Sequence, residues 1–270
     1  MKYMSFNSSC SYAGVANMLE RYGVDTDDRS IAMAMKLPYL FAKKNGIYMA
    51  GPMLQSADWF NLYLNPIGFE MIERELPAQQ VAGYLKQQKV AMLGLRVDEN
   101  GKHAVVHIGA RDGKLVFLNN KWQHTKDPER ITLTEEQLLS QLGDTVMIAT
   151  LKRTEPKQIQ FAGILENSVA VLRQNVAQIR ELCGRNTTVS ELRKELNTIF
   201  RPLLLDGITM LQLGEQTQLA ERFTALQSSF LNALRQAPDC KLRLEDYLSV
   251  PELEAAAQQY IQWIQEQLQK

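Results

Sequence analysis

The sequence predicts an α+β domain over residues 1–153, followed by an all-α helical bundle over residues 156–270. The two parts differ in hydrophobic periodicity. The first mixes helical spacing with the alternation of strands, and the second has helical spacing only. Within the first part the helices come early and an antiparallel set of strands comes late, which is typical of an α+β domain. The change falls near residues 154–157.

The expected helices of the first part begin at capping residues or proline and end at glycine or proline. The first is amphipathic and ends before Gly23, and the second has Asp27 or Asp28 as its N-cap. Thr132 or Thr134 caps a short helix that ends at residue 142. The other expected ranges are residues 10–21, 27–37, 51–64 and 77–88.

The expected strands alternate apolar and polar residues and are separated by turn sequences. Asn100-Gly101 and Asp112-Gly113 are hairpin turns, so the strands around them run antiparallel. The expected strands cover residues 69–72, 90–97, 103–110, 115–118 and 146–151.

Four amphipathic helices are expected in the second part, because apolar residues recur there at steps of three or four. The second of them is interrupted at Pro202. Their apolar positions lie within residues 161–183, 189–203, 219–230 and 253–268.

The composition excludes several classes of protein. The 30 basic and 30 acidic residues balance, so no basic footprint for nucleic acid is present. The three cysteines have no CxxC spacing, and we expect neither a disulfide framework nor a metal site, and no cofactor. No signal peptide and no membrane span are expected. Together these features favour a reducing, cytoplasmic location.

Cys10 begins the first expected helix. A helix start presents unpaired N–H groups and the positive end of the helix dipole, which favour a thiolate and therefore a nucleophile. The alternative is a small buried apolar residue. Cys183 lies on an apolar helix stripe and is expected in the core, and Cys240 lies in a loop.

A thiolate nucleophile needs a base, and the base needs a group that orients it. His103 begins a strand, and Asn119 ends the next strand of the same hairpin, so the two side chains can meet. The amide oxygen of Asn119 can then accept the imidazole N–H of His103. His107 shares the strand parity of His103 but is expected to be structural, and His124 is expected at the surface.

Three segments within residues 5–151 resemble papain-like cysteine peptidases of the bacterial family that cleaves double-glycine leaders of bacteriocins. Residues 7–23 (NSSCSYAGVANMLERYG) resemble the nucleophile helix of that family. Residues 103–109 (HAVVHIG) resemble its histidine strand, and residues 115–119 (LVFLN) resemble the strand that ends in its third catalytic residue. Residues 76–97 also match the segment before the histidine, whereas the helical part has no counterpart.

The resemblance implies that Cys10 is the nucleophile, His103 the base and Asn119 the orienting residue. The family has a glutamine six residues before the cysteine as its oxyanion donor, and Met4 stands there in this chain. Asn7 and Gln55 are the candidates to replace it, together with the backbone N–H of Cys10. Asn120 replaces the proline that follows the third catalytic residue in the family.

The resemblance leaves three functions open. A hydrolase would cleave a peptide or amide bond through an acyl-enzyme on Cys10. An acyltransferase would move an acyl group from a carrier-protein thioester to an amine, and the two-part layout resembles that of the butirosin-pathway acyltransferase. A catalytically inactive domain would bind a peptide in the same cleft. The expected partner is a peptide or an acyl carrier, and the helical part is a candidate surface for a homodimer.

Overall fold

The computed structural model describes residues 1–96 and 101–269. Asn100 and most of the expected turn around it lie outside the described residues. The chain forms two compact units. The first contains residues 1–35 and 55–159, and the second contains residues 36–54 and 160–270. The expected boundaries, 1–153 and 156–270, do not assign residues 36–54 to the helical unit.

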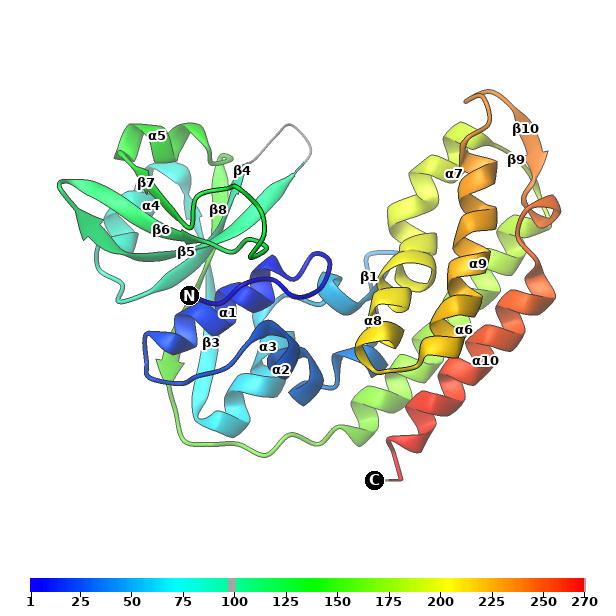
Figure 1. The fold of residues 1–270 in the computed structure, drawn as a ribbon, viewed down its shortest axis with the longest axis horizontal. Helices are drawn as coiled ribbons and strands as arrows, with labels where there is room; N and C mark the ends of the chain where they lie inside the picture. The colour runs from blue at the N-terminus through cyan, green and yellow to red at the C-terminus, as the bar shows by residue number, and fades with distance from the viewer. Residues whose placement is uncertain (97–100, 270) are drawn as a thin grey trace. The chain divides into compact units, whose positions relative to one another are not determined.

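The first unit combines five α-helices with a six-stranded sheet in its described part (Figure 1). The helices are α1 (Cys10–Glu20), α2 (Asp28–Ala34), α3 (Ala57–Leu64), α4 (Ala78–Leu85) and α5 (Glu135–Ser140). The strands are β3 (Phe69–Pro77), β4 (Ala91–Arg96), β5 (Lys102–Arg111), β6 (Lys114–Asn119), β7 (Arg130–Leu133) and β8 (Thr145–Arg153).

All pairings in this sheet are antiparallel, in the order β3-β8-β4-β5-β6-β7. One face packs against α4 and α5 through a continuous apolar cluster that includes Val81, Val105 and Leu138. The opposite face packs against α1, which lies across β4 and β5 (Figure 1). The expected α+β class, with the Cys10 helix packed on an antiparallel sheet, is confirmed.

The second unit is mainly helical, as expected. Its helices are α6 (Ala162–Cys183), α7 (Val189–Glu195), α8 (Gly207–Leu213), α9 (Thr217–Leu234) and α10 (Val250–Glu266). The expected interruption at Pro202 appears as two π-helical turns between α7 and α8, because proline lacks the N–H that a regular helix needs. The sequence prediction missed two short strand pairs, β1 (Phe41–Lys44) with β2 (Ile47–Ala50) and β9 (Asn186–Thr188) with β10 (Lys241–Arg243).

The β1–β2 hairpin belongs to the helical unit because its buried side packs on α6 and α10. The backbone N–H of Phe41 donates to Ser168 Oγ at 3.1 Å, and the Phe41 ring meets the edge of Tyr260 at 5.2 Å. The hydroxyl of Tyr260 donates to the carbonyl of Pro38 at 2.8 Å. None of the described helices is both long and apolar enough to cross a membrane.

Candidate active site

Cys10 is the first residue of α1, as expected, and a buried carboxylate holds the loop that leads to it. Asp28 is fully buried at the start of α2. It accepts hydrogen bonds from the backbone N–H and the hydroxyl of Ser5 and from the hydroxyl of Ser9, each at 2.7 Å. The neighbouring Asp27 is the N-cap of α2. Asp28 therefore fixes the segment immediately before the thiol.

A buried amide network attaches α1 to the sheet. The side chain of Asn120 accepts from Asn17 Nδ2 at 3.0 Å and donates to the carbonyl of Ala104, also at 3.0 Å. Gly14 allows this approach, since a Cβ there would lie 2.7 Å from Asn120 Nδ2 and 2.4 Å from Met92 Sδ. Both asparagines are fully buried. The helix that carries Cys10 is thereby fixed next to the backbone of the strand that carries His103.

A β-bulge decides which way Asn119 faces. Directly opposed residues in an antiparallel pair share one face of the sheet. The register between β5 and β6 shifts between His107 and Gly109, so that Asn119 lies opposite Val105. Val105 is two residues from His103 and shares its face. The bulge therefore places Asn119 on the same face as His103.

Without the bulge, Asn119 would face the other way. The turn end of the hairpin pairs Arg111 with Lys114, and an unbroken register from there would bring Asn119 opposite Val106. The side chain of Val106 points to the α1 face. Gly109 has a φ of +135°, a conformation that L side chains rarely adopt, so the bulge is built at a glycine.

Cys10 and His103 stabilise each other's charged forms. Burial would raise the pKa of the Cys10 thiol, but the hydrogen bond to His103, the N–H of Ala104 and the charge of the imidazolium together lower it below its ordinary value. Burial would lower the pKa of His103, but the contact with Cys10 and the neighbouring Asn119 and Asp127 raise it above its ordinary value. These opposite shifts favour a thiolate next to an imidazolium.

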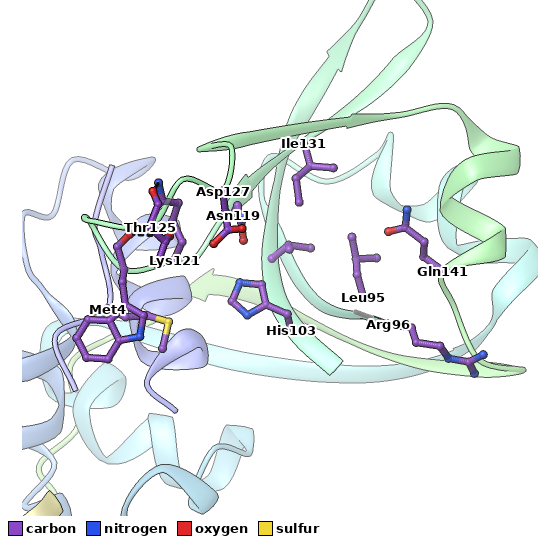
Figure 2. A pocket seen from close by; sticks show the side chains of 12 residues that line it. Met4, Leu95, Arg96, His103, Asn119, Lys121, Thr125, Asp127, Ile131 and Gln141 are labelled. Carbon is purple, nitrogen blue, oxygen red and sulfur yellow. Dashed lines mark hydrogen bonds between the residues drawn. The ribbon is translucent and has the colours of Figure 1, made fainter. Parts of the chain in front are cut away.

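Asn119 is held with its amide oxygen available for His103. Its Nδ2 donates to the carbonyl of Pro128 at 3.0 Å. The amide oxygen is not used in this bond and can accept from the imidazole. Figure 2 shows Asn119 and Asp127 on the same side of the imidazole. His103 Nε2 is buried and makes no hydrogen bond of ordinary length and angle to the described residues, and Asn119 lies close enough to the imidazole to raise its pKa. Catalytic hydrogen bonds are often long without substrate and tighten when it binds.

The two oxyanion candidates differ in their surroundings. Gln55 lies beside the start of α1, where its Oε1 accepts from the hydroxyl of Ser11 at 2.7 Å. Its Nε2 has no hydrogen-bond acceptor among the described residues. Asn7 is exposed, and its side chain has no hydrogen bond to the described residues. Gln55 is therefore the better-positioned donor.

Met4 does not fill the oxyanion position with another donor. Its backbone N–H donates to the carbonyl of Lys121 at 2.9 Å, and it forms an isolated parallel bridge with Trp122. Its side chain lines a cavity beside His103.

The other histidines and cysteines lie apart from this constellation. His107 is buried against Phe117, with 5.6 Å between the ring centroids, and burial lowers its pKa. Cys183 is buried in the helical unit, where burial raises its pKa to about 11. His124 is exposed, as expected. No group of three or more potential metal ligands occurs among residues 1–96 and 101–269.

Sequence reasoning missed the residues that position the site. The sequence predicts Asp28 only as a helix cap and Asn120 only as a replacement for proline. The single available signal was Asn17, a polar residue on the apolar face of the expected helix. Its partner lies 103 residues away in the sequence, and the spacing of residues along one element does not reveal such a partner.

No protein-family model matches this sequence, and no curated protein is significantly similar to it. The solved structures that match this chain include two peptidases. One is the peptidase domain of Streptococcus ComA, a bi-functional ABC transporter involved in a quorum-sensing pathway. It is 13% identical to this chain with a TM-score of 0.41, and the match covers 56% of this chain and 96% of that domain. A C39-like peptidase from Bacillus anthracis is 15% identical with a TM-score of 0.35, covering 56% of this chain and 92% of that one.

We predict that Asp28→Ala slows the alkylation of Cys10 by iodoacetamide on the order of tenfold, because the loop before the thiol loses its anchor. The same change removes three hydrogen bonds to a buried carboxylate and lowers the free energy of unfolding by about 3 kcal/mol. Asp27→Ala is the matched control. It removes only a helix cap, costs about 1 kcal/mol and leaves the rate unchanged. Equal rates for the two variants would contradict the anchoring role.

We also predict that Cys10 keeps its alkylation rate at lower pH than the half-buried Cys240. The reason is that its thiol pKa is lowered by the contact with His103. In His103→Ala the burial of the thiol remains and the hydrogen bond is lost, so the inflection of the rate moves to higher pH. Residue-resolved mass spectrometry measures all three cysteines, and Cys183 serves as an unreactive reference. If His103→Ala does not move the inflection of the Cys10 alkylation rate with pH, the ion pair is contradicted.

Proposed function

We propose that this protein is a thiol-dependent hydrolase that cleaves a peptide or amide bond through an acyl-enzyme on Cys10. The observation that carries the proposal is the contact between the Cys10 thiol, at the start of α1, and the His103 imidazole, near the start of β5. In this contact each group shifts the pKa of the other toward its charged form. A buried cysteine without such a partner has a raised pKa, as Cys183 does. Lowering a buried thiol pKa against desolvation is characteristic of a nucleophile.

The proposed reaction uses the two charges in turn. The Cys10 thiolate attacks the carbonyl carbon, and its Sγ–C bond forms as the carbonyl oxygen takes up the negative charge. As the C–N bond breaks, His103 donates its proton to the leaving amine. Neutral His103 then accepts a proton from water, whose oxygen attacks the thioester. The Sγ–C bond breaks, the acid leaves and the ion pair is restored.

Asn119 supports this sequence by holding the imidazole while its protonation changes. The negative oxygen of the tetrahedral intermediate needs two donors near Cys10. The first turn of α1 offers the backbone N–H of Cys10, which has no partner within the helix. The free Nε2 of Gln55 is the second donor in this proposal. Its bond to Ser11 supports the assignment because that bond fixes the amide near the start of the helix.

The test is cleavage of a diverse peptide library, read by mass spectrometry of the new termini. We expect the native protein to cleave a subset of the peptides, and we expect Cys10→Ala and His103→Ala to cleave none. Gln55→Ala should lower kcat on the order of 100-fold, because one oxyanion donor is lost. Asn7→Ala is the matched control and should retain the native rate.

Other outcomes would contradict parts of the proposal. If product appears only when an amine is added, the reaction is acyl transfer and not hydrolysis, although the acyl-enzyme on Cys10 is the same. Absence of any acyl adduct on Cys10, in a protein that binds the same peptides, would favour the non-catalytic peptide-binding domain. Equal effects of Gln55→Ala and Asn7→Ala would remove Gln55 from the oxyanion site.

A further inference from the structure

A cavity of about 690 Å³ lies beside His103. It opens on the sheet face that carries His103, Val105 and Asn119, and Cys10 does not line it. Figure 2 shows Lys121 and Thr125 toward one end and Arg96 and Gln141 toward the other, with His103, Leu95 and Ile131 between them. The remaining lining residues are Met4, Val105, Asn119, Trp122 and Asp127.

The position of the cavity indicates which part of the substrate it would hold. In the proposed mechanism, His103 passes its proton to the leaving group, so the leaving group must lie on the imidazole side of Cys10. The cavity is on that side. Its floor is apolar, formed by Leu95, Val105 and Ile131, and a cavity of this size holds a ligand of several to many heavy atoms.

Lys121 is the unusual residue of this cavity. The residue is 8% exposed, and Nζ donates to the carbonyl of Thr125 at 2.7 Å. Among the described residues, no carboxylate lies within 4.0 Å of Nζ. A buried ammonium ordinarily has an anionic partner, because the loss of hydration is otherwise uncompensated. With one N–H bonded to Thr125, two donors remain for a ligand.

The backbone holds Lys121 in place. Its N–H donates to the carbonyl of Asn119 at 2.8 Å, and its carbonyl accepts from Met4 at 2.9 Å. The charged residues that line the cavity are Arg96, Lys121, Asp127 and, in its protonated form, His103. The carboxylate of Asp127 is exposed, and its charge raises the pKa of His103. With His103 protonated, the lining residues carry three positive charges and one negative charge. Of Arg96, Lys121 and Asp127, only Lys121 is buried.

We propose that this cavity binds the leaving group of the substrate, and that this leaving group has an apolar body and an anionic group that pairs with Lys121. The inference rests on the proposed acyl-enzyme chemistry of Cys10 and names the substrate class for the same site. The anionic group is a carboxylate, as on an amino acid or short peptide, or a phosphate, as on the prosthetic arm of an acyl carrier. Both accept charge-assisted hydrogen bonds from an ammonium.

The experiment measures acylation of Cys10 by four acetyl thioesters, with intact-mass detection. One pair compares mercaptobenzoate with thiophenol as the leaving group, and the other compares phosphopantetheine with pantetheine. In each reaction the Sγ–C bond forms, the C–S bond of the donor breaks, and the leaving thiolate takes the proton from His103. The quantity compared between variants is the anionic-to-neutral rate ratio, so intrinsic differences in leaving ability cancel.

We expect Lys121→Met to lower this ratio about tenfold in one pair, which identifies the carboxylate or the phosphate as the preferred group. Lys121→Arg keeps a cation and should keep the ratio. Lys126→Met, which removes an exposed lysine from the same loop, is the matched control and should also keep it. If Lys121→Met leaves the anionic-to-neutral rate ratio of both pairs unchanged while Cys10 is still acylated, the anion site is overturned and the proposed function is not. Failure of all four thioesters to acylate the native Cys10 would overturn the proposed function, and the anion site with it.

Discussion

The contact between Cys10 and His103 is the interaction on which the rest of the site depends. Burial acts against both charges, raising the thiol pKa and lowering the imidazole pKa. Each charge is nevertheless favoured by the other beside it, in a setting where charges attract more strongly than in water. A small displacement of either side chain would leave two neutral groups. The surrounding structure must therefore hold α1 and β5 in a fixed position relative to each other.

Three features of the fold fix the positions of Cys10, His103 and Asn119. Asp28 fixes the loop before Cys10, and the Asn17–Asn120 network fixes α1 on the sheet beside His103. The bulge at Gly109 turns Asn119 toward the imidazole. Asn119 and Asn120 are consecutive and point to opposite faces of the sheet, so one lies on the face of the imidazole while the other anchors α1. The same strand end leads into Lys121, which brings the cavity beside His103 into this assembly.

Local patterns predicted much of this arrangement. The amphipathic helix after Cys10, the strand that begins at His103 and the strand that ends at Asn119 could all be predicted, because periodicity and turn residues determine them. The bulge could not, since an unbroken hairpin fits the same sequence and turns Asn119 away. The packing of residues 36–54 with the helical unit and the burial of Asp28 were also missed, because both depend on contacts distant in sequence.

The most direct test is nitrogen NMR of the His103 imidazole as a function of pH, in the native protein and in Cys10→Ser. Serine keeps the size of the side chain but does not ionise in this range. The account predicts that native His103 stays protonated to higher pH than its ordinary value, and that its pKa falls in Cys10→Ser, since burial then acts unopposed by the thiolate. Identical titration of His103 in the two proteins would contradict the ion pair.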